Sequence, residues 1–131
     1  MEITLNKETM RQLSDLKTFV EKNGIVKDEV VKRLMDVRPH FIQQKEPLVT
    51  RVVRLTAEYI GENGVFNLNL LAEEDEEGNI EVEIDMEAED SFNLVKENFL
   101  YLVDLCAHPD NQLNKDELQR IKAMYLERDL I

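Results

Sequence analysis

The sequence predicts an α+β fold in which about five α-helices pack around one antiparallel β-hairpin, within a single domain of residues 1–131. Two observations lead to this prediction. Apolar residues recur at spacings of three and four in five separate segments, as on one face of a helix. Between residues 65 and 87 the spacing changes to two, which is typical of half-buried β-strands.

Three helices are predicted in the first half of the chain, at about residues 6–23, 27–37 and 47–61. Asn6 is a suitable capping residue for the first helix. Pro39 is expected to end the second, because proline lacks the N–H group that continues a helix. Pro47 suits the first turn of the third. The residues expected to face inward are Met10, Leu13, Leu16, Phe19, Val20, Val30, Val31, Leu34, Met35, Val37, Val49, Val52, Val53, Thr56, Tyr59 and Ile60.

The β-hairpin is predicted at about residues 65–72 and 79–87, joined by a loop that contains Gly78. Glycine accepts the positive φ angle that such a loop needs. If the loop is Glu76-Glu77-Gly78, three apolar pairs face each other across the strands: Ala72 with Val82, Leu70 with Ile84 and Leu68 with Met86. The same register places the like charges of Glu73 and Glu81 opposite each other on the outer face.

Two further helices are predicted at about residues 91–107 and 114–128, the second opening at Asn114 in a pattern similar to a capping box. Apolar residues occupy two sides of the fourth helix: Val95, Phe99, Leu102, Val103 and Cys106 on one, and Leu94, Tyr101 and Leu105 on the other. A girdle this wide predicts a helix that is covered on two sides. The cover is either the rest of the chain or a second subunit, so a homodimer through this helix stays open.

Negative charge is concentrated in one part of the sequence. Residues 72–91 hold eleven carboxylates and no Lys or Arg, whereas the whole chain has a net charge of −12. Because the stretch between Arg54 and Lys96 carries −13, the remainder carries +1, and residues 26–54 have a basic excess. This balance disfavours direct nucleic-acid binding, which depends on phosphate neutralisation by basic side chains.

The sequence is expected to belong to a cytoplasmic protein with no membrane segment and no signal peptide. Its most apolar run, Phe99 to Val103, is far shorter than the ~20 residues that span a bilayer. The first ten residues lack the basic and apolar regions of a signal peptide. The single cysteine, Cys106, cannot form an internal disulfide, which suits a reducing compartment.

No catalytic residue, cofactor or metal ligand is predicted. Cys106, His108 and Asp110 are spaced two apart and His40 lies elsewhere, so a nucleophile pair or small metal site is conceivable. Burial of Cys106 on an apolar helix face explains that residue more simply. An EF-hand centred on Gly78 fails, because its twelfth position is apolar. The phosphate-binding and hydrolase motifs are also missing.

The acidic stretch therefore carries the functional hypothesis, a non-enzymatic module that binds a basic protein surface. The expected partner-binding residues are Glu73, Glu74, Asp75, Glu76, Glu77, Glu81, Glu83 and Asp85. If the partner is a nucleic-acid-binding protein, this chain would act as a DNA mimic or an antirepressor. If the partner is a basic toxin, this chain would act as an immunity-like protein. The partner would equally be the Arg-bearing middle segment of a second copy of this chain.

Three alternatives stay open at this point. The charged face would serve only to keep a hairpin edge from pairing with another chain. A small enzyme or metal-binding domain would use carboxylates with His40 or His108. A structural homo-oligomer would associate through the fourth helix.

Overall fold

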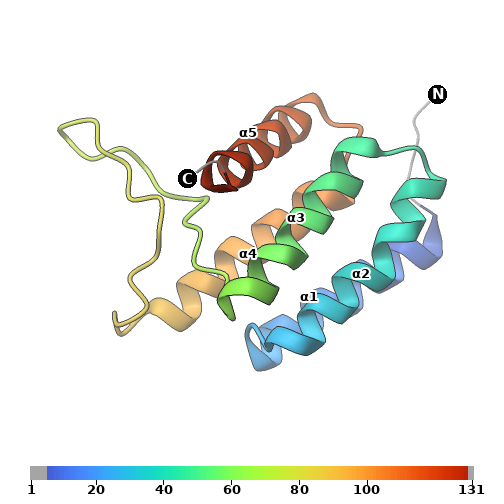
Figure 1. The fold of residues 1–131 in the computed structure, drawn as a ribbon, viewed down its shortest axis with the longest axis horizontal. Helices are drawn as coiled ribbons and strands as arrows, with labels where there is room; N and C mark the ends of the chain where they lie inside the picture. The colour runs from blue at the N-terminus through green and yellow to red at the C-terminus, as the bar shows by residue number, and fades with distance from the viewer. Residues whose placement is uncertain (1–5, 130–131) are drawn as a thin grey trace.

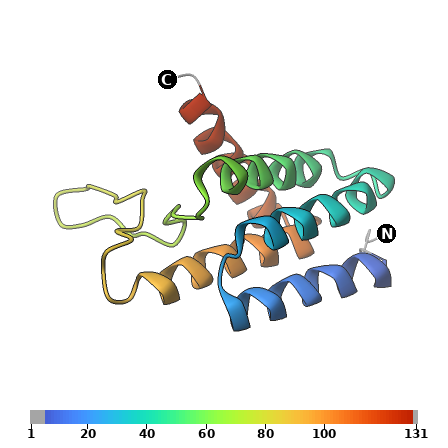
Figure 2. The same cartoon turned by 60° about the horizontal axis from the view of Figure 1, so that its bottom comes forward.

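The structure, a computed structural model, describes residues 6–129, which form five α-helices and no β-strand. The helices are α1 (Lys7–Asn23), α2 (Lys27–Gln43), α3 (Pro47–Asn63), α4 (Ser91–Ala107) and α5 (Gln112–Asp129). Helix α2 packs against α1 and α3, α3 also packs against α5, and α4 lies against α1 and α5. A long connection between α3 and α4 extends away from the helices in both views (Figures 1 and 2).

The predicted α+β fold is therefore wrong, because the segments 65–72 and 79–87 do not form the strands of a β-hairpin. They approach each other only at an isolated antiparallel bridge between Leu68 and Glu83. The five helices do occur where helical spacing indicated them. None of the helices in the described part of the chain is long and apolar enough to cross a membrane.

Asn6, the capping residue that the sequence indicated, and Gly24 fix the two ends of α1. The side-chain Oδ1 of Asn6 accepts hydrogen bonds from the backbone N–H and the hydroxyl of Thr9, both at 2.8 Å. This cap satisfies a donor that the helix itself leaves unpaired. At the other end Gly24 has φ 74°, and its N–H donates to the carbonyl of Val20 at 2.8 Å. A positive φ is open to glycine and strained for other residues.

Helix α2 continues past Pro39 to Gln43, six residues beyond the predicted end at 37. Continuing the helix buries Phe41 completely, which stabilises by ~1.5–3 kcal/mol and offsets most of the ~3 kcal/mol that an internal proline costs. Gln44 reinforces the end of this helix. Its side-chain amide donates to the carbonyl of His40 at 2.8 Å and to the hydroxyl of Thr9 at 2.7 Å.

Helix α5 begins at Gln112, two residues before the predicted start at Asn114. Asn111 supplies the hydrogen bonds that fix this end. Its side-chain Oδ1 accepts from the N–H of Asn114 at 3.1 Å, and its carbonyl accepts from the N–H of Lys115 at 3.0 Å. A capping residue three positions earlier than expected therefore sets the start of the helix.

The core joins all five helices and the first part of the connection. Phe41, Phe66 and Phe99 are its largest fully buried side chains, and the rings of Phe66 and Phe99 meet edge to face at 5.4 Å. Such a geometry is favourable for aromatic pairs. The wide apolar girdle of α4 is covered largely within the chain, since Leu105 is buried and Leu94 and Tyr101 are half-buried. Two predicted core residues, Met10 and Met35, are exposed instead.

Candidate functional site

The candidate site is the connection between α3 and α4, residues 64–90, which we call the acidic loop. Four apolar side chains of this loop are buried against the helices: Phe66, Leu68, Leu70 and Ile84. Burial of side chains of this size stabilises by ~1.5–3 kcal/mol each. The base of the acidic loop is therefore part of the core, although the remainder projects from the molecule (Figure 1).

The two arms of the acidic loop are paired over a short distance near this base. The N–H of Asn69 donates to the carbonyl of Val82 at 2.9 Å, and the N–H of Ile84 donates to the carbonyl of Asn67 at 2.7 Å. These bonds place Leu68 opposite Glu83, whereas the predicted register placed it opposite Met86. A turn over residues 69–72 accommodates this shift in register. It is closed by a hydrogen bond from the N–H of Ala72 to the carbonyl of Asn69.

Side chains from α4 and α5 explain why the pairing stops. Oδ1 of Asn98 accepts a hydrogen bond from the N–H of Leu71 at 2.9 Å. An Nη atom of Arg120 donates to the carbonyl of Leu70 at 3.2 Å. These backbone groups are satisfied by side chains, so they are not available to a neighbouring strand. Arg120 is itself held by Glu117, which in turn accepts a hydrogen bond from the hydroxyl of Tyr101 at 2.6 Å.

The tip of the acidic loop is a tight turn closed by Asp75. Its carboxylate accepts hydrogen bonds from the N–H groups of Glu77 at 2.9 Å and Asn79 at 2.8 Å, and its own N–H donates to the carbonyl of Asn79. Gly78 has φ 84°, as a turn of this kind favours. Several hydrogen-bond donors lower the pKa of Asp75, and the backbone N–H of Asn79 has the largest effect.

Asp85 has a similar local role nearer to α4. Its carboxylate accepts a hydrogen bond from the N–H of Glu87 at 3.0 Å, and its carbonyl accepts one from the N–H of Ala88 at 3.1 Å. Two of the eight predicted partner-binding residues, Asp75 and Asp85, therefore each use a carboxylate oxygen to shape the loop.

All eight predicted partner-binding residues are exposed. Within residues 6–129, seven of them take part in no salt bridge: Glu73, Glu74, Asp75, Glu76, Glu77, Glu81 and Asp85. The negative charges thus lie together, exposed to water, on one projecting segment. The sequence has no Lys or Arg between Arg54 and Lys96, so no basic residue of this stretch offsets them.

Apolar side chains lie among these carboxylates. Ile80, Val82 and Met86 are exposed by 49, 48 and 42%, so the apolar pairs predicted for Val82 and Met86 do not form. Leu71, at the turn that interrupts the first arm, is 47% exposed. Only Ile84 from the second arm reaches the core. The surface of the acidic loop therefore combines negative charge with exposed aliphatic groups.

The structure places the residues considered for catalysis or metal binding in different surroundings. Cys106 is buried, and burial raises the pKa of its thiol to about 12, which leaves it protonated and unreactive at neutral pH. His108 is the residue that follows α4, whereas His40 lies within α2 beside Gln12, 3.0 Å away. In the described part of the chain, no group of three or more His, Cys, Asp or Glu side chains is placed to hold a metal ion.

The structure thus defines an all-helical protein with a projecting acidic loop that is anchored to the helices by apolar and hydrogen-bonded contacts. Comparisons with known protein families, curated proteins and solved structures give no match to this chain.

Sequence reasoning missed the residues that anchor the acidic loop, chiefly Asn98 and Arg120. Asn98 was one signal that the sequence offered, because it is a polar residue within the apolar girdle of the fourth helix. A polar side chain at such a position needs a hydrogen-bond partner when it is buried. The partner itself, a backbone N–H group 27 residues away, carries no sequence signal.

Proposed function

We propose that this chain is a non-enzymatic interaction protein whose acidic loop binds a basic surface of a partner protein. The observation that carries the proposal is the outer part of the loop, residues 73–83. It exposes seven carboxylates beside Ile80 and Val82, and it projects from the helices on a base that is held by the core. A charged surface that includes apolar groups is suited to protein recognition, since charge steers the encounter and apolar contact supplies affinity.

The chemistry of the loop defines the partner. The partner would present several Lys or Arg side chains around an apolar patch that accepts Ile80 and Val82. A nucleic-acid-binding protein and a basic toxin both have surfaces of this kind, so roles as a DNA mimic, an antirepressor or an immunity-like protein are included in the proposal. The anchored base means that the loop reaches such a partner already folded, which reduces the entropy lost on binding.

The proposal places the protein in the cytoplasm. A reducing compartment suits a chain whose single cysteine is buried and cannot form an internal disulfide.

The test compares three baits in a pull-down from native lysate. The first is wild type. The second carries Glu73→Gln, Glu74→Gln, Glu76→Gln and Glu81→Gln, which remove four charges from the loop and leave the turn-forming Asp75 and Asp85 in place. The third is a matched control with Glu21→Gln, Glu62→Gln, Glu97→Gln and Glu127→Gln, four exposed carboxylates on the helices. Both variants change the net charge by the same amount.

The expected result is a basic protein retained by wild type and by the helix variant, and lost from the loop variant. Its binding should weaken as salt is raised, because exposed charges are screened. Identical sets of bound proteins on all three folded baits would refute the proposal. So would a partner lost equally from both variants, since that result would report net charge rather than the loop.

A further inference from the structure

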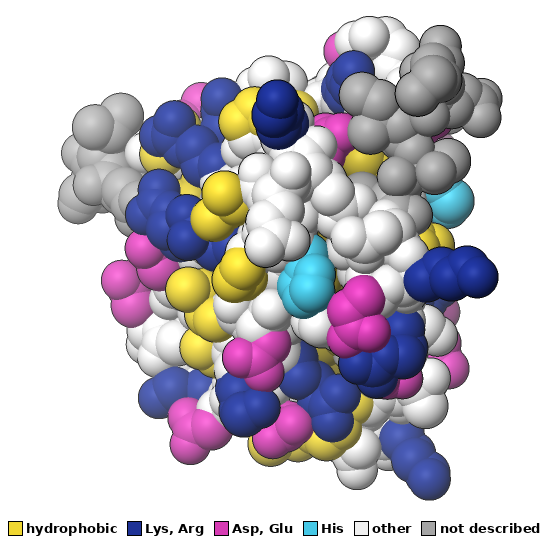
Figure 3. Space-filling model, turned by 90° about the vertical axis from the view of Figure 1, so that its right-hand side faces the viewer, with side chains coloured by type: hydrophobic (Ala, Val, Ile, Leu, Met, Phe, Trp, Pro, Cys, Tyr) yellow, Lys and Arg dark blue, Asp and Glu magenta, His cyan; other side chains and the backbone are white. Residues whose placement is uncertain are grey.

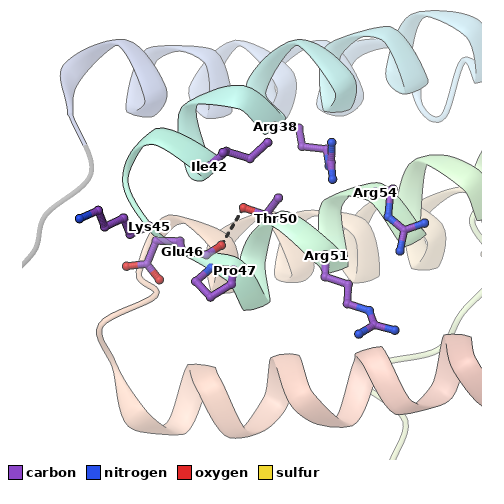
Figure 4. A pocket seen from close by; sticks show the side chains of 8 residues that line it. All are labelled: Arg38, Ile42, Lys45, Glu46, Pro47, Thr50, Arg51 and Arg54. Carbon is purple, nitrogen blue, oxygen red and sulfur yellow. Dashed lines mark hydrogen bonds between the residues drawn. The ribbon is translucent and has the colours of Figure 1, made fainter.

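A pocket of about 390 Å³ lies between the second half of α2 and the first half of α3. We call it the α2–α3 pocket. It is lined by Arg38, Ile42, Lys45, Glu46, Pro47, Thr50, Arg51 and Arg54, whose side chains are drawn in Figure 4. This volume lies within the range of small-molecule sites, ~300–1,000 Å³. The pocket is separate from the acidic loop, which leaves the opposite end of α3 (Figure 1).

The lining is strongly cationic, with three arginines and one lysine against a single carboxylate. Figure 4 shows Arg38 reaching from α2 toward α3, while Arg51 and Arg54 extend from successive turns of α3. Like charges that line one pocket repel one another, so their grouping disfavours the empty pocket and favours an anion that enters it. Figure 3 views the end of the molecule away from the acidic loop, where Lys and Arg side chains are numerous.

The arginines of the α2–α3 pocket have unused hydrogen-bond donors. Nε of Arg38 is buried and has no hydrogen-bond partner among residues 6–129, although a buried N–H of this kind normally has one. Arg51 takes part in no salt bridge within residues 6–129. Arg54 is partly neutralised by Glu58, whose carboxylate lies 2.9 Å from its Nη1. A ligand with several acceptor oxygens would satisfy the accessible donors of these side chains, chiefly those of the exposed Arg51, and would reach Nε of Arg38 after that side chain shifts.

Two other polar residues of the pocket, Thr50 and Glu46, already interact with neighbouring groups. The hydroxyl of Thr50 donates to the carbonyl of Glu46 at 2.7 Å, as drawn in Figure 4. The carboxyl of Glu46 is partly desolvated, which raises its pKa, while the charge of Lys115 lowers it. Glu46 opposes an anion, but its effect is smaller than that of the four cations around it.

We propose that the α2–α3 pocket binds the phosphate group of a small organic phosphate. The guanidinium fork matches phosphate oxygens in two parallel hydrogen bonds, and three arginines suit a group that carries two or more negative charges. Ile42, which is 52% exposed, and Pro47 provide an apolar surface next to the cations for the organic part of the ligand. A nucleoside diphosphate combines both features and is the probe of choice.

The acidic loop of a second copy is the other anion that this chain could offer to the pocket. The two features lie toward opposite ends of α3, so that pairing would join copies head to tail (Figure 1). A head-to-tail contact gives an open chain unless its rotation happens to close a ring. The size of the pocket and the three arginines that line it fit a small phosphate better.

The test is isothermal titration calorimetry at fixed ionic strength on the full chain, with ADP, pyrophosphate, inorganic phosphate and adenosine as separate probes. The pocket variant carries Arg38→Gln and Arg51→Gln, and Arg51→Gln alone serves if the double variant unfolds. The control carries Arg11→Gln and Lys32→Gln, two exposed cations in the groove between α1 and α2. Sedimentation of each variant reports self-association.

We expect saturable binding of ADP by wild type, and no binding of adenosine. The pocket variant should bind ADP at least tenfold more weakly, and the control should stay within about twofold of wild type. Inorganic phosphate that binds as tightly as ADP, with the same dependence on arginine, would support the phosphate site and replace the organic ligand by the free ion. No saturable binding of any probe at millimolar concentration would overturn the proposal. So would self-association that depends on Arg38 and Arg51 but is unaffected by ADP.

Discussion

The side-chain amide of Asn98 on α4 holds the backbone of the acidic loop. Its Oδ1 accepts the N–H of Leu71 at 2.9 Å, and its Nδ2 donates to the carbonyl of Leu94 at 2.8 Å. Asn98 is only 1% exposed, so water cannot replace these bonds. The relationship ties the loop to the core at the point where the first arm would otherwise continue as a strand.

Asn98→Ala should destabilise the protein by ~1–3 kcal/mol, because the N–H of Leu71 would lose its partner inside the protein. Urea unfolding measures the change. Hydrogen exchange of the amides in residues 67–72 should become faster at the same time. The control is Asn93→Ala, an exposed asparagine on the same helix, which should change stability by no more than about 0.5 kcal/mol. Equal stability of wild type and Asn98→Ala would show that the bond to Leu71 contributes nothing.

Tyr101 should make stability depend on pH in the alkaline range. Partial desolvation raises its pKa to about 12, and the hydrogen bond to Glu117 adds to the rise. The unfolded chain releases this proton at a lower pH than the folded chain, near 10. The contribution of Tyr101 is therefore fully present below pH 10 and is lost as the pH rises to about 12.

Tyr101→Phe isolates this contribution, since it removes the ionisable hydroxyl. Unfolding free energies of wild type and variant should be measured from pH 8 to pH 12, and the difference between them should shrink between about pH 10 and 12. Contributions from groups that are the same in both proteins cancel in the comparison. A constant difference over this range would contradict the raised pKa.

The helices could be predicted from the sequence because their signals are local. Apolar spacing and the cap at Asn6 each depend on residues within a few positions of one another. The prediction that Pro39 ends the second helix was wrong because it too used only a local signal. The local preference of proline is to end a helix, and only the distant contacts that bury Phe41 reverse it. Tertiary burial of that kind leaves no trace in the spacing around residue 39.

The β-hairpin prediction failed because alternation is necessary for a half-buried strand but does not supply its partner. Leu68, Leu70 and Ile84 are buried as the alternation indicated, against helices rather than in a sheet. Asn98 and Arg120 occupy the backbone groups that a second strand would need. The charge of the candidate site was visible in the sequence, but its anchoring by these long-range contacts was not. The cations of the α2–α3 pocket were visible only as a basic excess in residues 26–54.

Two glycines should respond to alanine with opposite signs. Gly24 has φ 74° and ψ −159°, a region that is essentially restricted to glycine, so Gly24→Ala should destabilise by ~1–3 kcal/mol. A Cβ atom there would also lie 2.6 Å from the ring of Phe92. Gly61 lies inside α3, where an added Cβ atom would have no neighbour within 4 Å beyond the adjacent residues and the local helix backbone, so Gly61→Ala should stabilise by ~0.5–1 kcal/mol.

Thermal or urea unfolding of the two variants decides this prediction, and each serves as the control for the other. Because Phe92 is 56% exposed, its ring can move away from an added methyl group. Adding Phe92→Ala to Gly24→Ala should therefore leave most of the loss in place. Full recovery in the double variant would mean that the contact with the ring, rather than the backbone conformation, disfavours alanine.

Removal of the Asp75 carboxylate should loosen the tip of the acidic loop without affecting the core. Asp75→Ala deletes the acceptor for the N–H groups of Glu77 and Asn79, so these two amides should exchange with solvent faster, as measured by NMR. Global stability should stay close to that of wild type, because the tip is exposed and packs against nothing buried. Asp75→Asn keeps an acceptor oxygen and should preserve most of the protection, whereas Glu76→Ala, at an exposed neighbour, should have no effect.

The same turn should respond to acid. The pKa of Asp75 is lowered in the folded protein, chiefly by the N–H of Asn79, so the turn is favoured at every pH above the ordinary value of 3.8. As the pH falls below that value and through the lowered pKa, the neutral carboxyl becomes a weaker hydrogen-bond acceptor than the carboxylate, so the tip should lose part of its protection. Chemical shifts of Glu77 and Asn79 followed from pH 6 downward report this step. A midpoint at or above 3.8 would show that the carboxylate does not hold the turn, and the bonds to Asp75 would then carry no preference for the charged form.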